Sequence, residues 1–298
     1  MPASTERIVG KSSKLREFKL TLLLLWKNNV SKIGLIVIAI FLFVCILGPV
    51  LAPRDPYAID VSLAKIPPGA RFWFGTDLLG RDIFSRMLHG AIISLASGLI
   101  IVGMGVFIGV TIGLISGFFH RSIGQILMRL PDIFLAFPTL VLAISLAVTF
   151  GPSLTNALIA MSLVYWPPFA RLMYGETLSI MESDYVKFAK TLNQSPTRIM
   201  LRHVLPNAVS PIIIQASLDF GDAILLAAVL GFLGLGAQPP SPEWGAMVAQ
   251  GRNYLFDFWW MSIIPGSAIF LVTLAFNFLG DGIRDALDPN IRRIKKAD

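Results

Sequence analysis

Long apolar runs constrain this chain more than any other feature of its sequence. Crossing a bilayer as a helix takes about 20 predominantly apolar residues. Six runs have this character, at roughly residues 33–52, 91–118, 124–149, 154–174, 208–235 and 262–281. In lipid the backbone must satisfy its own hydrogen bonds, and a helix does so within one segment. The sequence therefore predicts an all-α integral membrane protein with six transmembrane helices.

Charged residues are scarce and lie between the apolar runs. They make up 14% of the 298 residues, whereas a soluble domain contains about 25%. The net charge of +7 is compatible with nucleic-acid binding, but the lysines and arginines form short flanks and no continuous stripe. Flanks of this kind are typical topology signals. We therefore predict membrane lipid around the chain and no nucleic-acid partner.

The basic residues also predict the orientation in the membrane. Residues 1–32 contain seven lysines and arginines against two glutamates, so the positive-inside rule places the N-terminus in the cytoplasm. An even number of spans returns the C-terminus to the same side. The predicted organisation is a cytoplasmic segment at 1–32, a six-span domain at 33–281 with an outer loop at 53–90 and an inner loop at 182–206, and a cytoplasmic tail at 282–298.

Two further patterns concern packing and the membrane surface. Glycines recur every fourth residue in the second run, at Gly105, Gly109, Gly113 and Gly117. A face of small residues lets two helix backbones approach closely in lipid, so it predicts helix packing within the chain or with a partner. Aromatic residues crowd the outer segment 236–261, which is typical of the membrane–water interface.

No catalytic constellation is visible in the sequence. A phosphate-binding GxxxxGK[ST] loop is absent, and the glycine-rich segment 231–236 ends an apolar run with no strand before it, so we interpret it as a helix terminus at the outer surface. The three histidines are far apart, and Cys45 is the only cysteine. We therefore predict no enzyme activity, cofactor or metal site in this chain, and any ATP hydrolysis must occur in another chain.

The inner loop at 182–206 has the pattern of a short helical hairpin. Tyr185, Phe188, Ala189 and Leu192 share one helical face, and Asn193 follows where a left-handed residue ends a helix. Ser195 then caps a second helix with Pro196 at its first position, Ile199, Met200 and His203 share one side of it, and Leu205 and Pro206 close the segment. The apolar face needs a cover, either the membrane helices of this chain or a groove on a soluble partner.

This loop resembles the coupling segment, the EAA loop, of binding-protein-dependent ABC importer permeases. The matching residues are Asp184-Tyr185-Val186, Ala189, Ser195, His203 and Leu205-Pro206-Asn207. Two positions depart from the family pattern: its acidic-Ala-Ala start is Lys187-Phe188-Ala189 here, and its glycine is Asn193. Asparagine tolerates the left-handed conformation, so we expect the turn to be retained.

Further matches extend the resemblance over almost the whole chain. They lie at 74–77, 80–82, 85–86, 236–240, 242–245 and 280–285, and they are similar to the C-type subunit of the dipeptide, oligopeptide and nickel permease family. The resemblance implies a type I ABC importer permease of the prokaryotic plasma membrane. It also implies a second related permease, two ATP-binding subunits that hold ATP and magnesium, and an extracytoplasmic substrate-binding protein. Dipeptides or short oligopeptides are the expected cargo, with nickel or a metal chelate as the alternative.

The resemblance assigns ATPase coupling to the hairpin. The expected coupling residues are Asp184, Tyr185, Val186, Phe188, Ala189, Leu192, Asn193, Ser195, His203, Leu205 and Pro206. In this interpretation the chain forms half of the translocation pathway and works by alternating access. Two other classes stay open from the residues alone, an autonomous secondary transporter and a membrane enzyme.

Acidic residues inside the apolar runs are candidates for the pathway, because a charge in a membrane span is costly. Asp219 and Asp222 share a face of the fifth run, where they suit a peptide ammonium group, a metal complex or a basic side chain of a partner permease. Asp132 in the third run is expected to pair with Arg129 or water. In the outer loop, Asp82 and Arg86 are expected to pair on a helix that Asp77 caps. Contact with the binding protein is the alternative role of this segment.

Overall fold

A computed structural model describes residues 23, 25–121 and 123–287. Most of the predicted cytoplasmic segment at 1–32 and of the predicted tail at 282–298 therefore lies outside the described residues. The described part is all-α, as predicted, and its only β pairing is an isolated bridge between Thr76 and Asp82. The helices are α2 (Asn29–Leu51), α3 (Ile83–Phe118), α4 (Ile123–Leu127), α5 (Arg129–Leu135), α6 (Thr139–Phe150), α7 (Leu154–Met181), α8 (Asp184–Thr191), α9 (Pro196–Ile199), α10 (Leu205–Phe232), α11 (Trp244–Gly251) and α12 (Trp260–Leu287). Short turns are η1 (Val61–Leu63), the π-helical η2 (Met200–Val204) and η3 (Arg252–Tyr254).

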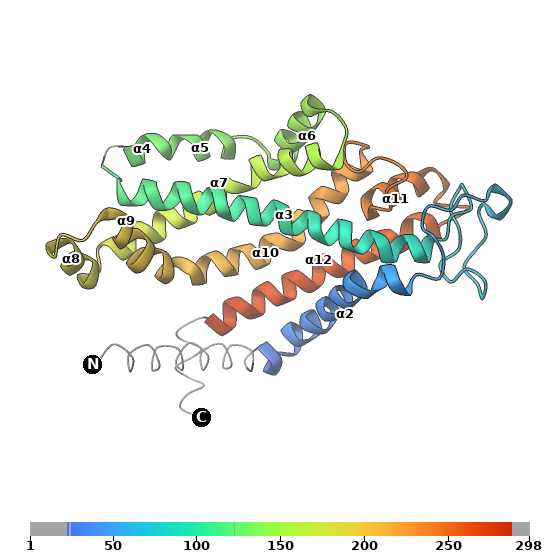
Figure 1. The fold of residues 1–298 in the computed structure, drawn as a ribbon, viewed down its shortest axis with the longest axis horizontal. Helices are drawn as coiled ribbons and strands as arrows, with labels where there is room; N and C mark the ends of the chain where they lie inside the picture. Colours follow the sequence, from blue (N-terminus) through green and yellow to red (C-terminus); the bar gives the residue numbers. More distant parts are fainter. Residues whose placement is uncertain (1–22, 24, 122, 288–298) are drawn as a thin grey trace.

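The six predicted runs fall on four long helices, one broken helix and α7. By length and composition, the described residues contain four helices able to cross a membrane: α2, α3, the continuous segment Pro196–Phe232, and α12. Ile123–Leu135 and Thr139–Phe150 count as a fifth span only as a pair bent by 89°. Helix α7 has 28 residues, about 42 Å at 1.5 Å per residue, and runs beside α3 along the bundle (Figure 1).

The third predicted run is broken at one of its two prolines. Pro138 precedes α6 as its N-cap, at the 89° bend. Pro131, by contrast, lies in the first turn of α5, where a helix donates no backbone hydrogen bond from that position and tolerates proline. The run is therefore broken at Pro138, whereas Pro131 leaves α5 intact.

Helices α3 and α7 pack through the four glycines of α3. A Cβ atom at Gly105 would lie 3.2 Å from the Tyr165 carbonyl oxygen, and one at Gly117 would lie 2.5 Å from the Thr177 Cβ. Both glycines belong to the stripe seen in the sequence, and all four are buried. The close approach that this stripe allows is thus made inside the chain.

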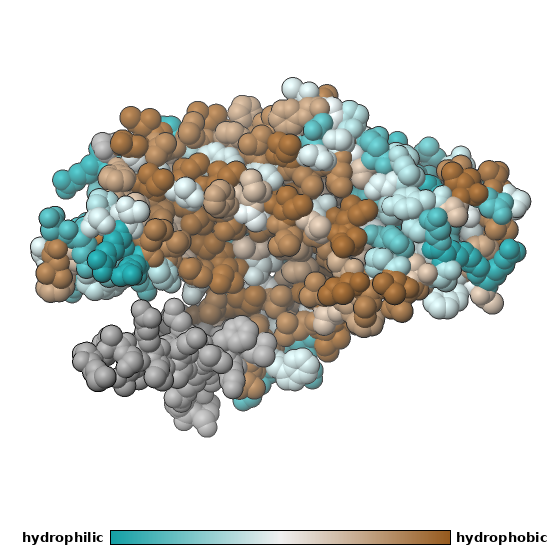
Figure 2. All heavy atoms as spheres, viewed as in Figure 1, coloured by the Kyte–Doolittle hydropathy of each residue, from teal (hydrophilic) through white to brown (hydrophobic). Residues whose placement is uncertain are grey.

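The two ends of the bundle are polar and its middle is apolar (Figure 2). The outer-loop segment before α3 and α11 lie at one end of the long axis, and α8 and α9 lie at the other (Figure 1). Apolar side chains between the ends are widely exposed, for example Ile46 at 73% and Phe107 at 70%. Such exposure in the middle of helices suits lipid as the surrounding solvent.

Candidate functional site

The α8–α9 hairpin turns at the residue that the sequence predicts. Asn193 has φ 53°, within the left-handed region that asparagine tolerates. Its N–H donates to the Lys190 carbonyl at 2.9 Å, and the N–H of Gln194 donates to the Ala189 carbonyl at 3.3 Å. These two bonds satisfy the last carbonyls of α8 in the manner of a Schellman end. Asparagine therefore replaces glycine here without loss of the turn.

The second arm of the hairpin differs from the prediction in its cap. Ser195 occupies the N-cap position of α9 and Pro196 follows at the start, but the serine side chain makes no capping hydrogen bond. His203 instead joins the two arms, because its Nε2 lies 3.1 Å from the Gln194 Oε1 and its ring is 6.4 Å from that of Tyr185.

The apolar face of α8 divides into a covered part and an open part. Val186 and Ala189 are 0% and 3% exposed and join the apolar cluster that contains Ile199. Phe188 and Leu192 are 64% and 60% exposed. Ala189 therefore lies inward, which corrects its predicted place on the face of Phe188 and Leu192. Tyr185, at 47%, lies on the open part. The chain itself covers one part, and the other is available to a partner.

The lysine that departs from the family pattern forms an ion pair at the start of the hairpin. The Lys187 Nζ lies 3.0 Å from the Glu182 Oε2, and both side chains are exposed. The hydrogen bond from Lys187 holds the pKa of the Glu182 carboxyl below its ordinary value. Asp184 lies in the first turn of α8, where a negative charge complements the helix dipole.

The hairpin leads without interruption into a membrane helix. Leu205 and Pro206 are the first residues of α10, which follows directly from α9 and η2. The segment Pro196–Phe232 is long and apolar enough to cross a membrane as one unit. Because its backbone is continuously helical from α9 to α10, we expect a displacement of α9 at the end of the bundle to be transmitted to α10.

Asp219 and Asp222 on α10 line one cavity in the middle of the bundle. The cavity has a volume of about 410 Å³. Its walls come from α5, α6, α7 and α10: Phe134, Leu135, Thr139, Val164, Tyr165, Pro167, Pro168, Asp219, Asp222, Leu225 and Leu226. Asp219 accepts a hydrogen bond of 2.9 Å from Gln215. Within the described residues, neither carboxylate has a cationic group within 4.0 Å.

Asp132 has a different partner from the one predicted. It forms an ion pair with Arg171 of α7, and not with Arg129. The sequence suggests Arg129 because it is near along the chain. The packing of α5 beside α7 instead places Arg171, 39 residues away, next to Asp132. Tyr165, which shares the cavity with the two acids, also gave no signal because it lies within an apolar run.

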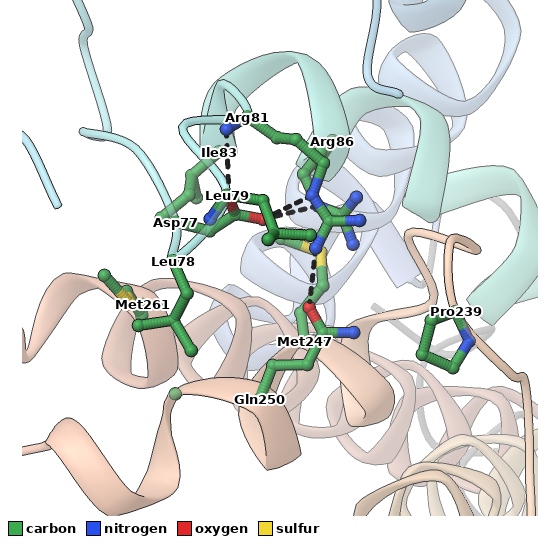
Figure 3. Close-up of a pocket in the computed structure, with 11 residues that line it drawn as sticks. Asp77, Leu78, Leu79, Arg81, Ile83, Arg86, Pro239, Met247, Gln250 and Met261 are labelled. Carbon is green, nitrogen blue, oxygen red and sulfur yellow. Dashed lines mark hydrogen bonds and ion pairs between the residues drawn. The ribbon is translucent and has the colours of Figure 1, made fainter. Parts of the chain in front are cut away.

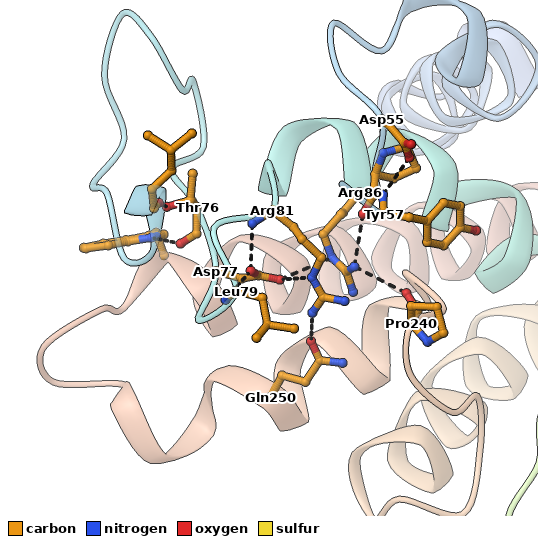
Figure 4. Close-up of polar contacts among 12 residues, drawn as sticks. Asp55, Tyr57, Thr76, Asp77, Leu79, Arg81, Arg86, Pro240 and Gln250 are labelled. Carbon is orange, nitrogen blue, oxygen red and sulfur yellow. Dashed lines mark hydrogen bonds and ion pairs between the residues drawn. The ribbon is translucent and has the colours of Figure 1, made fainter. Parts of the chain in front are cut away.

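The outer loop reverses the predicted roles of its two aspartates. Asp82 is the N-cap of α3 and accepts the Ser85 N–H at 2.9 Å. Asp77 instead pairs with Arg81, whose Nε lies 2.7 Å from its Oδ2 (Figure 4). The Nε of Arg86 is 3.8 Å from the same oxygen. The loop is therefore held by its own buried charges, with Asp77 as the pairing residue.

The aromatic residues of the outer segment also divide into two groups. Trp244 and Trp260 are 1% and 5% exposed, and their indole N–H groups donate to the carbonyls of Met87 and Thr76. They belong to the core, so their interpretation as interface residues was wrong. Phe256 and Trp259 are 98% and 49% exposed, as the interface interpretation requires.

The match to a family model decides the identity of the chain. The model describes the inner membrane component of binding-protein-dependent transport systems, and it matches residues 109–293. The chain belongs to this family. A second model, the N-terminal transmembrane domain of oligopeptide transport permease C, matches residues 18–68 of the permease.

Individual proteins of known type resemble the permease along most of its length. A probable D,D-dipeptide transport system permease protein of Escherichia coli strain K12 is 48% identical, over 85% of both chains. A di/tripeptide transport system permease protein of Pseudomonas aeruginosa is 41% identical, over 98% of the permease and 97% of that protein. An inward-facing structure of the MetNI methionine ABC transporter has a chain with a TM-score of 0.55 and 18% identity, over 68% of the permease and 97% of that chain. This last likeness concerns the fold alone.

These findings identify the permease as one component of a transporter with several subunits. It is a multi-pass inner membrane component of an ABC transport system, in which separate subunits hydrolyse ATP. Family membership implies ATPase and substrate-binding partners. The fold expected of a type I importer permease agrees with the structural likeness.

Proposed function

We propose that this permease forms half of the translocation pathway of an ATP-driven importer of dipeptides or short oligopeptides. A second related permease supplies the other half, two subunits bind ATP and magnesium, and an extracytoplasmic protein delivers the cargo. Both termini lie in the cytoplasm. The peptide cargo is supported by the two curated relatives, which are a D,D-dipeptide and a di/tripeptide permease.

The observation that carries the proposal is the open apolar face of α8. Phe188 and Leu192 expose large apolar side chains at the polar end of the bundle. The turn at 192–195 connects α8 to the continuous helical segment of α9, η2 and α10. An aromatic and an aliphatic anchor on a short helix suit a groove of a soluble partner. Closure of the ATPases would pull the hairpin, and α10 would carry the movement into the bundle. Asp184, Tyr185, Asn193, Ser195 and His203 shape this contact.

The cargo pathway is proposed to pass Asp219 and Asp222. Both carboxylates line the cavity of about 410 Å³, and the amino terminus of a peptide is a cation of matching charge. Mostly apolar walls with a few polar groups are typical of small-molecule sites. Because α10 carries both the acids and the connection to the hairpin, its movement would change access to them.

The test is a double substitution of Phe188 and Leu192 by alanine in the complete transporter. Copurification of the ATPases and peptide-stimulated ATP hydrolysis in nanodiscs are both measured. Interface anchors contribute about 2 kcal/mol or more, so we expect hydrolysis to become at least about tenfold less responsive to peptide. Leu201→Ala is the matched control, since Leu201 is an equally apolar, 55% exposed residue on η2. Unchanged coupling in the double variant would contradict the proposal.

A further inference from the structure

A second cavity lies at the end of the bundle that carries α11 and the loop before α3, and it shares no lining residue with the cavity of Asp219 and Asp222. It has a volume of about 280 Å³ and is bounded by the loop before α3, the first turn of α3, α11 and the start of α12 (Figure 3). Its lining is mostly apolar, with Leu78, Ile83, Met247 and Met261 among the walls. One side, called the charged side below, is formed by the charged residues Asp77, Arg81 and Arg86 and by the neutral Gln250.

The charged side contains more positive than negative charge. The guanidinium groups of Arg81 and Arg86 share the single carboxylate of Asp77. The nearby carboxylate of Asp82 faces a different cation, Arg54, at 3.9 Å. Arg81 and Arg86 are 4% and 1% exposed, and guanidinium stays protonated in proteins. A buried positive charge without a full counter-charge is costly.

The two guanidinium groups differ in how well they are satisfied. Arg81 donates to Asp77 at 2.7 Å and to Gln250 at 3.1 Å. Arg86 makes two long bonds from Nη1, each of 3.3 Å, to the carbonyls of Pro56 and Pro240. Its Nη2 is buried and has no hydrogen-bond partner within the described residues. Buried donors are nearly always paired, so Arg86, a lining residue of the cavity, has a donor to spare.

We propose that this outer cavity binds a carboxylate carried on a short apolar chain. The carboxylate takes the free donor of Arg86 and completes the charge balance of the cluster. The apolar body lies against Met247 and Met261. An anion without an apolar body would leave these walls unfilled, and a neutral amide would leave the positive charge uncompensated. The proposal does not depend on the identity of the transported cargo.

The test uses trifluorobutyrate as the probe and fluorine NMR as the measurement. The full chain is purified with its associated subunits in lipid nanodiscs, and trifluorobutyramide serves as the neutral comparison. We expect the acid to bind in the millimolar range and to be displaced by butyrate, and we expect the amide to bind at least about tenfold more weakly. Equal binding of acid and amide, or no binding of the acid, would overturn the proposal.

Two variants locate the binding in the cavity. Arg86→Met removes the free donor, and Met247→Trp fills the cavity without changing any charge, so the second keeps the test valid if the first fails to fold. Each is expected to weaken binding of the acid by about tenfold or more. Arg71→Met is the control, because Arg71 is an exposed cation of the same loop outside the cavity lining. Binding that survives Met247→Trp in full would refute the assignment.

Discussion

Glu243 shows how one residue connects three elements at the outer end. As the N-cap of α11 it accepts the N–H groups of Gly245 and Ala246, each at 2.8 Å. Its Oε1 also lies 3.4 Å from the Ser94 hydroxyl of α3, and the side chain packs against Gly231 of α10. Burial raises the pKa of this carboxyl, although the hydrogen bonds oppose the effect.

The raised pKa predicts a pH-dependent stability. Glu243 binds a proton more tightly in the folded chain than in the unfolded chain, where its pKa is about 4.3. Protonated Glu243 therefore contributes its full stabilisation to the free energy of unfolding at pH values below the unfolded pKa. This contribution is lost as the pH rises through the raised pKa of the folded chain. We expect Glu243→Gln to flatten this decline in thermal unfolding scans, at a lower midpoint because an amide keeps only one acceptor. Asp257→Asn, at an exposed residue of the same segment, should follow the wild type, and an unchanged decline in Glu243→Gln would contradict the assignment.

The pathway acids give a second prediction at the scale of residues. Asp219→Asn and Asp222→Asn should each weaken uptake of a peptide with a free amino terminus by roughly tenfold, since a hydrogen bond to a charged group contributes about 1.5–3 kcal/mol. The KM for an N-acetylated peptide should change little. Thr139→Val, at the same cavity, removes a polar group without removing charge and is the control. An equal loss of uptake for the free and the N-acetylated peptide would instead indicate that Asp219 and Asp222 pair with a basic side chain of the partner permease.

Among the helices, α3 and α7 approach each other closely at the glycine stripe of α3. A Cβ atom at Gly109 would lie 2.6 Å from the Phe169 Cβ and 2.8 Å from the Ala170 nitrogen. Gly109→Ala must therefore push the helices apart, and overpacking of this kind costs about 1–3 kcal/mol. Gly103 on the same helix has nothing within 4 Å of such an atom, so Gly103→Ala should leave the thermal midpoint unchanged or slightly raised. Equal effects of the two substitutions would argue against close packing at the stripe.

The sequence predicts features that depend on neighbours along the chain. The left-handed Asn193, the proline that starts α9 and the end of α10 near Gly234, with φ 80°, all follow from local backbone preferences. Contacts between residues on different helices of the bundle do not follow from these local preferences. Arg171 as the partner of Asp132, and the burial of Trp244, depend on which helices meet in space. Ala189 was misplaced for the same reason, because a helical face is known from periodicity but its covered side is not.

The whole molecule has two polar ends, and its orientation can be tested directly. Cys45 is the only cysteine, so Cys45→Ser gives a background for single labels. Phe256→Cys, at 98% exposure, should react with a membrane-impermeant maleimide on intact cells. Arg198→Cys, at an exposed residue of α9 outside the proposed docking face, should react only after the membrane is permeabilised. The reverse pattern would invert the topology and remove α8 from the side where ATP is available.

The open face of α8 has a further consequence for how cells maintain this protein. In the proposed assembly an ATPase covers Phe188 and Leu192, so a copy without its partners would leave both apolar side chains exposed. Exposed apolar surface of that kind promotes aggregation. Quality-control proteases and chaperones recognise such surfaces. On this proposal we expect copies made in excess of the ATPases to be degraded, so that the abundance of the permease follows that of its ATPases without any shared control of transcription.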